Sequence, residues 1–169
     1  MWIYYKKIKP ICTADEELDY IKLIESRQAN IPWLRFVGDQ TNFKIVRSKT
    51  SDAFGFANLK FFPEIANRVS TNIPNAIIEH SYVSRTMPRR ELDRHIDKKR
   101  TTAIIVPLGP YKGSITYYPL DLFTLTHHYS GPVVSRVNVP HSVKNESDSI
   151  RYSLTIEVSG SYWANLWQY

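Results

Sequence analysis

Hydrophobic and polar residues alternate along the second half of the chain with the period of two that is typical of β-strands. The alternation is clearest in residues 151–158, where Tyr152 and Leu154 lie on one face and Arg151 and Ser153 on the other. Similar runs, separated by Gly and Pro, occupy residues 76–86, 101–108, 113–118 and 132–139. Several short strands with this punctuation predict a double-sheet jelly roll of the cupin-like type.

Residues 1–75 follow a different pattern, in which two helices are expected to pack on the outside of a sheet. Thr13 and Glu16 form the sequence of a capping box, and apolar residues then recur near helical spacing as far as Gln28. A second helix is predicted to begin near Pro63, a residue favoured in the first turn. Other predictions are strands at residues 2–9 and 42–48, a loop at residues 32–41 and a mobile connection at residues 49–58.

The chain of 169 residues is long enough for one domain with a sizeable core. We therefore predict a single domain over residues 1–169, with helical support in about residues 1–75 and a β-core in about residues 76–158. Aromatic residues make up 13% of the chain, which favours a strand-rich fold. The predicted fold class is thus mainly β with flanking α-helices.

Composition and charge narrow the environment of the protein and its partners. The single cysteine, Cys12, excludes an internal disulfide and a cysteine-based zinc site, and it fits a reducing cytosol. The sequence starts without the apolar core of a signal peptide and contains no apolar run of about eighteen residues, so we predict a cytoplasmic protein without a membrane partner. The formal net charge of +6 would attract nucleic acid, an acidic protein segment or a small anion, and it equally fits a solvated basic surface.

Three residues have the chemistry and spacing of a metal site. His95 and Asp97 are two residues apart, so their side chains leave the same face of an extended strand. A second imidazole, His141, follows 44 residues later (97 to 141). Two imidazoles and one carboxylate form the facial triad that holds non-haem Fe(II) and leaves coordination positions open. The alternative is that these are surface residues on a basic hairpin.

A candidate anion clamp follows His141 by ten residues (141 to 151). Arg151 and Ser153 have period-two spacing on the last predicted strand, so both side chains can point into one cavity. A guanidinium binds a carboxylate through two parallel hydrogen bonds, and a hydroxyl can add another. Because Arg151 begins a strand that otherwise resembles core, it needs an anion, which is either a ligand or an internal Asp or Glu.

In this constellation the chain resembles the 2-oxoglutarate/Fe(II)-dependent dioxygenases. Their signature is His-x-Asp, a distal His, and an Arg about ten residues later that is often followed by x-Ser. All of these parts occur here in order, and the resemblance covers about residues 77–158. Asp93 also lies two residues from His95, but the order of the family's motif favours Asp97 as the ligand. The resemblance implies a double-stranded β-helix.

The resemblance also implies the cofactors and the reaction. Fe(II) would be held by His95, Asp97 and His141, and the cosubstrate 2-oxoglutarate would bind the iron while Arg151 and Ser153 grip its far carboxylate. O2 would then be used to hydroxylate an unidentified primary substrate, with release of succinate and CO2. Related halogenases have a small residue in place of the carboxylate, so Asp97 favours hydroxylation.

Two further residues are weaker candidates for contact with the cosubstrate. Tyr82 is predicted to donate its hydroxyl to the far carboxylate, as tyrosines on the corresponding strand of the family do, and Thr102 is a similar candidate. A structural role is the alternative for both. His80, His127 and His128 lack comparable partners, and the last two are expected in a loop.

The charged and aromatic segments around the motif allow more than one interpretation. A basic cluster flanks it, consisting of Arg85, Arg89, Arg90, Arg94, Lys98, Lys99 and Arg100. This cluster is either a solvated charge run or a means of orienting an anionic substrate. Near the end of the chain, Trp163, Trp167 and Tyr169 are expected to cover the barrel or to contact another subunit.

Two other functions remain open from the residues alone. A cupin-type metal enzyme would use the triad without 2-oxoglutarate, so its stability would respond to metal and not to the keto acid. A non-catalytic basic module for nucleic acid or a protein partner would show salt-sensitive binding that does not depend on His95 or His141. Neither the primary substrate nor the oligomeric state follows from the sequence.

Overall fold

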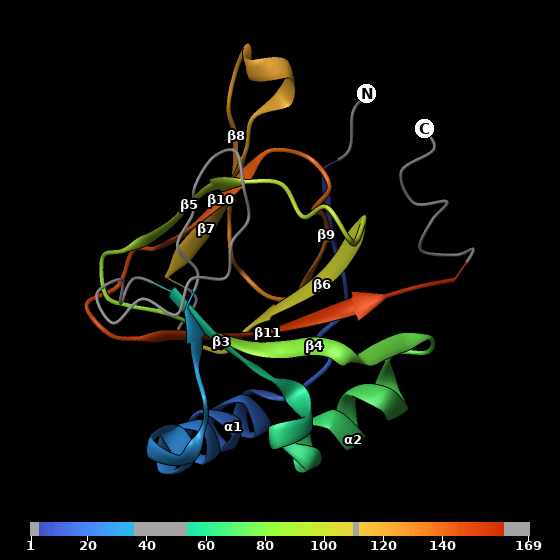
Figure 1. Cartoon of the computed structure of the whole chain (residues 1–169), viewed down its shortest axis with the longest axis vertical. Coiled ribbons are helices and arrows are strands. Elements are labelled where there is room, and N and C mark those ends of the chain that lie inside the picture. Colours follow the sequence, from blue (N-terminus) through green and yellow to red (C-terminus); the bar gives the residue numbers. More distant parts are fainter. Residues whose placement is uncertain (1–3, 36–53, 110–111, 161–169) are drawn as a thin grey trace.

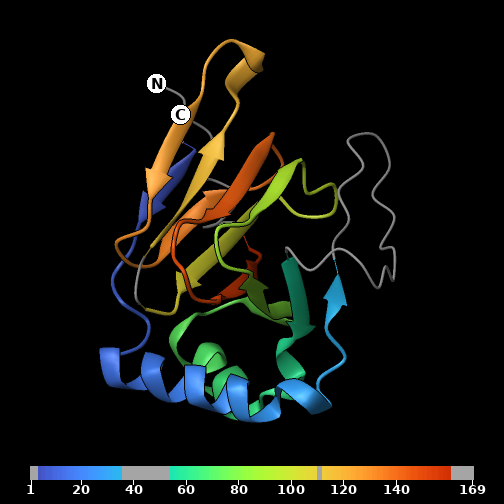
Figure 2. The same ribbon diagram turned by 90° about the vertical axis from the view of Figure 1, so that its left-hand side faces the viewer.

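Two stacked antiparallel sheets form the protein, and two helices cover the outer face of the larger one (Figures 1 and 2). The computed structural model describes residues 4–35, 54–109 and 112–160. The larger sheet contains, in spatial order, β1 (Tyr5–Lys7), β9 (Val133–Arg136), β6 (Thr102–Pro107), β11 (Arg151–Val158), β4 (Ala76–Thr86), β3 (Phe54–Asn58) and β2 (Leu34–Arg35). The smaller sheet contains β5 (Glu91–His95), β10 (His141–Asn145), β7 (Gly113–Tyr117) and β8 (Leu125–His128).

The chain crosses repeatedly between the two sheets as it runs from β4 to β11. Strands β4, β6, β9 and β11 belong to the larger sheet, while β5, β7, β8 and β10 belong to the smaller one. This winding is the jelly-roll arrangement, so the predicted double-stranded β-helix with flanking helices is confirmed.

The helices form where the sequence predicts them. α1 (Ala14–Arg27) begins with a complete capping box, in which the Glu16 amide donates to Thr13 Oγ1 (3.2 Å) and the Thr13 amide donates to Glu16 Oε2 (2.8 Å). α2 (Pro63–Asn72) has its proline in the first turn. Short 3₁₀ turns occur at Gln28–Asn30, Leu59–Phe61 and Pro119–Asp121. Both α-helices lie below the larger sheet in Figure 1.

β11 separates the main core from the interior of the barrel. Leu154 and Ile156, both fully buried, pack in the cluster that also contains Ile24 of α1 and Ile65 of α2. The alternate residues of β11, among them Ser153 and Thr155, line a cavity on the opposite face of the strand. The alternation seen in the sequence therefore assigns one face of this strand to the core and the other to a cavity.

Several local predictions are wrong. The connection predicted at residues 49–58 contains β3, which pairs with β4 and buries Phe54 and Ala57. Gly55 and Asn58 suggested a loop, but Gly55 provides room for Arg85, since a Cβ there would lie 3.0 Å from Arg85 Nε. His127 and His128 lie in β8 rather than in a loop, and His127 is buried against the Tyr5 ring.

The remaining predictions in these regions are partly outside the described residues. Of the strand predicted at residues 2–9, the structure shows residues 5–7 as β1. The strand predicted at residues 42–48 and the aromatic tail with Trp163, Trp167 and Tyr169 lie outside the described residues.

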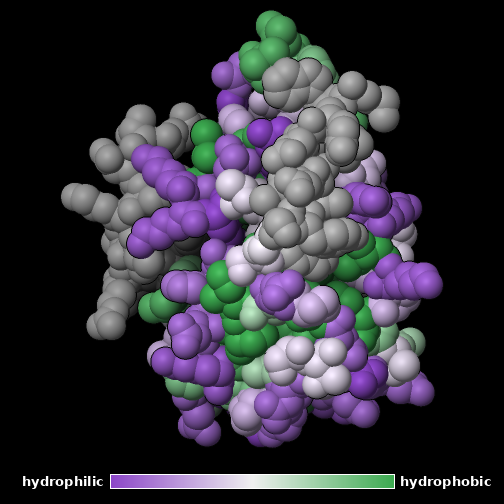
Figure 3. Space-filling model, turned by 90° about the vertical axis from the view of Figure 1, so that its right-hand side faces the viewer, coloured by the Kyte–Doolittle hydropathy of each residue, from purple (hydrophilic) through white to green (hydrophobic). Residues whose placement is uncertain are grey.

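One exposed apolar feature projects from the smaller sheet. The β7–β8 hairpin extends beyond the sheets in Figures 1 and 2. Figure 3 shows hydrophobic residues on the surface at that end of the molecule. Its tip carries Leu120, Leu122 and Phe123, which are 74%, 78% and 61% exposed. Among the described residues, every helix is too short or too polar to cross a bilayer.

Candidate metal centre

The smaller sheet brings the three predicted metal ligands together. His95 is the last residue of β5 and lies directly opposite His141, the first residue of β10. Asp97 follows β5 and is anchored by its amide, which donates to the Val137 carbonyl at 2.9 Å. One ligand atom from each of His95, Asp97 and His141 lies within 4.8 Å of the others. Asp93, the alternative carboxylate, is exposed and outside this group.

Backbone carbonyls fix both imidazoles in the orientation that metal binding requires. Nδ1 of His95 lies 2.7 Å from the Asp93 carbonyl, and Nδ1 of His141 lies 2.8 Å from the Val139 carbonyl. A carbonyl oxygen can only accept, so each Nδ1 carries the proton and donates it. Each Nε2 is then left with a lone pair, the form that binds a metal.

Burial keeps both imidazoles neutral. Loss of solvent lowers the pKa of His95, although Asp97 opposes the shift. Burial, reinforced by the neighbouring His95, lowers the pKa of His141 to about 4. Two neutral imidazoles and a carboxylate match the donor set of a non-haem iron site, so these residues fit the metal that the sequence predicts.

Arg151 lies in the same cavity as the three candidate ligands. The cavity is about 40 Å³ and is lined by Arg151 and Ser153 together with His95, Asp97 and His141. Arg151 is 5% exposed, its Nη1 donates to the Lys144 carbonyl at 3.2 Å, and its guanidinium lies 4.9 Å from the centre of the Tyr129 ring. The candidate metal ligands and a buried cation thus line one cavity.

Polar atoms at the Arg151 end of the cavity lack partners. Among the described residues, Nε of Arg151 and Oγ of Ser153 are buried and make no hydrogen bond, and no carboxylate oxygen lies within 4.0 Å of the guanidinium. Burial lowers the pKa of Arg151, while the nearby Tyr129 opposes this shift. Buried polar groups are normally paired, so these atoms fit an anionic ligand such as a carboxylate. The internal salt bridge that was the alternative for Arg151 is not found in the described part of the chain.

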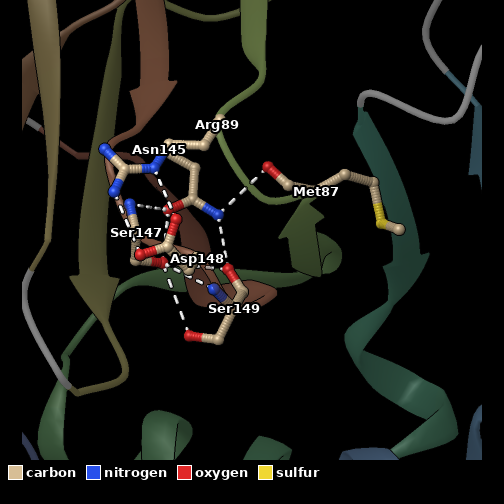
Figure 4. Close-up of polar contacts among 6 residues, drawn as sticks. All are labelled: Met87, Arg89, Asn145, Ser147, Asp148 and Ser149. Atoms are coloured by element: carbon tan, nitrogen blue, oxygen red, sulfur yellow. Dashed lines mark hydrogen bonds and ion pairs between the residues drawn. The ribbon is translucent and has the colours of Figure 1, made fainter.

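Two features of the surrounding strands determine where the Arg151 side chain can lie. Gly113 of β7 leaves room for the guanidinium, because a Cβ at this position would overlap Nη1 and lie 3.0 Å from Cζ of Arg151. The turn before β11 is fixed by the fully buried Asn145, whose amide nitrogen donates to the carbonyls of Met87 (3.1 Å) and Ser149 (2.8 Å) (Figure 4). The same nitrogen also donates to the Thr86 carbonyl (2.9 Å). This amide joins the β4–β5 turn to the β10–β11 turn.

The two weaker candidates occupy different places. Tyr82 lines the same cavity, but its hydroxyl accepts a hydrogen bond from Arg100. Tyr82 lies opposite Thr155 in the sheet, whereas Arg151 lies opposite Thr86. Tyr82 is therefore closer to the candidate metal ligands than to Arg151. Thr102 is buried on β6 and lines a separate pocket of about 420 Å³ with Lys98 and Lys99. The structure therefore does not bring Thr102 to the Arg151 cavity.

The sequence did not single out Arg100, which contacts the triad directly. Its Nη2 and Nε lie 2.7 and 2.9 Å from Oδ2 of Asp97. Arg100 follows Asp97 by three residues, a spacing that allows an ion pair, but the neighbouring Lys98 and Lys99 made Arg100 look like one member of a basic run. Other members of that cluster are also engaged, since Arg89 pairs with Asp148, Arg94 with Asp121, and Arg85 donates to Gln28. The cluster is therefore not one free basic surface.

Comparison with known proteins adds evidence on the fold. No protein-family model and no curated protein matches the sequence. Solved structures do match. A prolyl hydroxylase from Trichoplax adhaerens, in complex with a hypoxia inducible factor peptide, is 15% identical with a TM-score of 0.58, and the match covers 96% of this chain and 86% of that chain. A 2OG-Fe(II) oxygenase family oxidoreductase from Burkholderia pseudomallei is 13% identical with a TM-score of 0.52, covering 82% of this chain and 78% of that one.

The chain has the fold of the 2-oxoglutarate/Fe(II) oxygenases. HygX from Streptomyces hygroscopicus, with nickel and 2-oxoglutarate bound, agrees with this fold at 10% identity and a TM-score of 0.53, with 94% of this chain and 83% of that chain covered. The resemblance stated from the sequence is thus confirmed at the level of the oxygenase fold. At these identities the likeness extends to the fold alone, so the reaction is inferred from the site.

Proposed function

We propose that the protein is an Fe(II)- and 2-oxoglutarate-dependent oxygenase that hydroxylates a C–H bond of its primary substrate. The observation that carries this proposal is one cavity that holds both a His–Asp–His cluster and a buried arginine that makes no ion pair with any described residue. Neither half alone specifies this chemistry, because a triad without the clamp also fits a cupin-type metal enzyme. The combination fits a keto acid that binds a metal at one end and a guanidinium at the other.

Under this proposal, the three candidate metal ligands and the two residues of the candidate anion clamp have separate roles. His95, Asp97 and His141 would hold Fe(II) on one face, since one ligand atom from each lies within 4.8 Å of the others and both Nδ1 atoms are engaged by backbone carbonyls. Arg151 and Ser153 would bind the far carboxylate of 2-oxoglutarate through Nε and Oγ. When bound, iron and 2-oxoglutarate supply the oxidising chemistry, in which O2 and the cosubstrate yield succinate, CO2 and a hydroxylated product. The protein contributes orientation and the exclusion of water.

A second hollow beside the metal ligands supports an apolar reacting group on the primary substrate. It has a volume of about 170 Å³, and its lining joins the apolar side chains of Phe54, Phe56 and Leu92 to the polar ones of Tyr82, His95, Asp97 and Arg100. Pockets for whole drug-sized ligands are roughly 300–1,000 Å³, so this one suits a group the size of a side chain. Because the Trichoplax structure contains a peptide, peptides with apolar side chains are the first class to screen.

Anaerobic titration with Fe(II) and then 2-oxoglutarate tests the proposed function. Chelation of a keto acid at an open facial iron site is expected to give a weak visible band near ~500 nm. The band should be absent in His141→Ala, which loses the metal. Arg151→Met should keep the metal and need at least about tenfold more 2-oxoglutarate, the effect of losing about 1.4 kcal/mol of binding.

The same titration separates the other functions. Arg89→Met is the matched control, because that arginine is exposed and paired with Asp148 away from the cavity. Iron binding without the band would support the cupin-type enzyme. No iron binding at all would refute the metal centre and favour the basic binding module.

A further inference from the structure

Arg100 holds one oxygen of the candidate metal ligand Asp97. Nη2 and Nε of the arginine lie 2.7 and 2.9 Å from the same atom, Oδ2. Both side chains are 14% exposed, so the pair is shielded from water and from salt. Two charge-assisted hydrogen bonds to a single oxygen restrict rotation of the carboxylate.

The other oxygen of Asp97 faces the candidate metal site. Oδ1 lies 3.8 Å from Nε2 of His95, the nitrogen left with a lone pair. The two carboxylate oxygens therefore have separate environments, one directed to an arginine and one to the imidazole. A carboxylate can bind a metal through one or both oxygens, and here only Oδ1 is available.

Tyr82 in turn holds the guanidinium of Arg100. Nη2 donates to the Tyr82 hydroxyl, and the guanidinium lies 5.1 Å from the centre of the Tyr82 ring. The Tyr82 ring packs against Phe56, with centroids 5.3 Å apart. Arg100 is thus fixed from strand β4, independently of Asp97.

We propose that Arg100 is a positioning residue that keeps Asp97 a one-oxygen metal ligand. By binding Oδ2, it prevents the second oxygen from taking a coordination position that the cosubstrate or O2 needs. The inference deepens the proposed function and rests on it in one respect, the binding of a divalent metal by the triad. It also gives Tyr82 a role, support of Arg100 rather than contact with the far carboxylate.

Binding of Co(II), followed by calorimetry and by its visible spectrum without O2, tests this inference. Arg100→Met should weaken Co(II) binding by about 10- to 100-fold, the usual effect of removing a partner of a metal ligand. Its Co(II) spectrum should also change, because a two-oxygen carboxylate alters the coordination number, which a purely structural role would not. Arg100→Lys keeps a donor and a charge, and should restore the wild-type spectrum. Arg94→Met is the matched control, since Arg94 adjoins His95 but pairs with Asp121.

Each outcome decides the inference. An Arg100→Met protein with wild-type Co(II) affinity and spectrum overturns it while leaving the proposed function intact. A wild type that binds no Co(II) overturns the proposed function and this inference together. If Arg100→Met does not fold, Arg100→Gln, which keeps a polar side chain in the cavity, decides by the same two readouts.

Discussion

Gly113→Ala is expected to damage the anion clamp without touching any candidate ligand. A Cβ on residue 113 would overlap Nη1 of Arg151 and lie 2.6 Å from the Lys144 carbonyl oxygen, which is the acceptor for Nη1. The added methyl group would therefore lie between the donor and the acceptor of the hydrogen bond from Arg151 to the Lys144 carbonyl. Ordinary contact begins at 3.4 Å, so the carbonyl and the strand would have to separate by 0.8 Å (3.4 − 2.6). Since the carbonyl belongs to the backbone of β10, the guanidinium is the part that moves most readily.

The size of the effect follows from the hydrogen bonds that would be misaligned. A hydrogen bond to a charged group contributes about 1.5–3 kcal/mol, which corresponds to roughly 10- to 100-fold in affinity. We therefore expect 2-oxoglutarate to bind the Ni(II)-loaded Gly113→Ala protein about 10- to 100-fold more weakly than the wild type. Overpacking should also lower the free energy of unfolding by about 1–3 kcal/mol. Metal affinity should be unchanged, because the three ligands do not contact residue 113.

Calorimetric titration of 2-oxoglutarate into the Ni(II)-loaded protein measures this effect. Gly109→Ala is the control, because a Cβ there meets its nearest atom, Glu17 Oε2, at an ordinary 3.6 Å. A folded Gly113→Ala protein that binds 2-oxoglutarate like the wild type would refute the placement of the carboxylate at Arg151. A loss of Ni(II) binding would show instead that the substitution disturbs the whole barrel.

Three further predictions concern the metal ligands, pH and the polar network. His95→Ala should abolish Fe(II) binding measured by calorimetry, and equal affinity in both proteins would contradict the ligand assignment. In metal-free protein, burial lowers the pKa of the His141 imidazole to about 4, so between pH 6.5 and about 4 this imidazole is protonated in the unfolded chain but not in the folded one. The free energy of unfolding should therefore fall by about 3 kcal/mol as the pH falls through that window. Urea titrations at pH 7 and pH 4 measure this fall, and His141→Gln should reduce it. Asn145→Ala should cost about 3 kcal/mol of unfolding free energy, because it leaves buried carbonyls unpaired. Arg89→Ala should cost much less, because its ion pair with an aspartate is exposed, and similar losses for the two variants in thermal melts would argue against this ranking.

Local rules were sufficient for the parts of the fold that depend on neighbouring residues. The capping box of Thr13 and Glu16 closes within one turn, so its sequence predicts it directly. The alternation on β11 is equally local, and it located Leu154 in the core and Ser153 in the cavity. Pairing with a distant strand is not local. β3 was missed because glycine is typical of loops, whereas Gly55 in the sheet makes room for Arg85 of β4.

The same distinction applies to the candidate site. His95, Asp97 and His141 were predicted from their order and spacing, which the opposition of β5 and β10 turns into proximity. The partner of a side chain cannot be deduced in this way. Tyr82 was expected to bind a ligand carboxylate, but its hydroxyl accepts from Arg100, a contact set by how the segment after β5 folds back over β4.

The two arginines that line the cavity differ in a way that separates support of the site from recognition of a ligand. Arg100 has its anion within the protein, in Asp97, and its charge is thereby balanced before any ligand arrives. Arg151 is buried and makes no ion pair among the described residues. Burial lowers its pKa, although the charge of Glu146 opposes this shift, and a buried cation without a close anion is costly. A fold under no other constraint would pair both. Under the proposed function, Arg151 is therefore the group whose partner comes from outside the chain, namely the far carboxylate of 2-oxoglutarate.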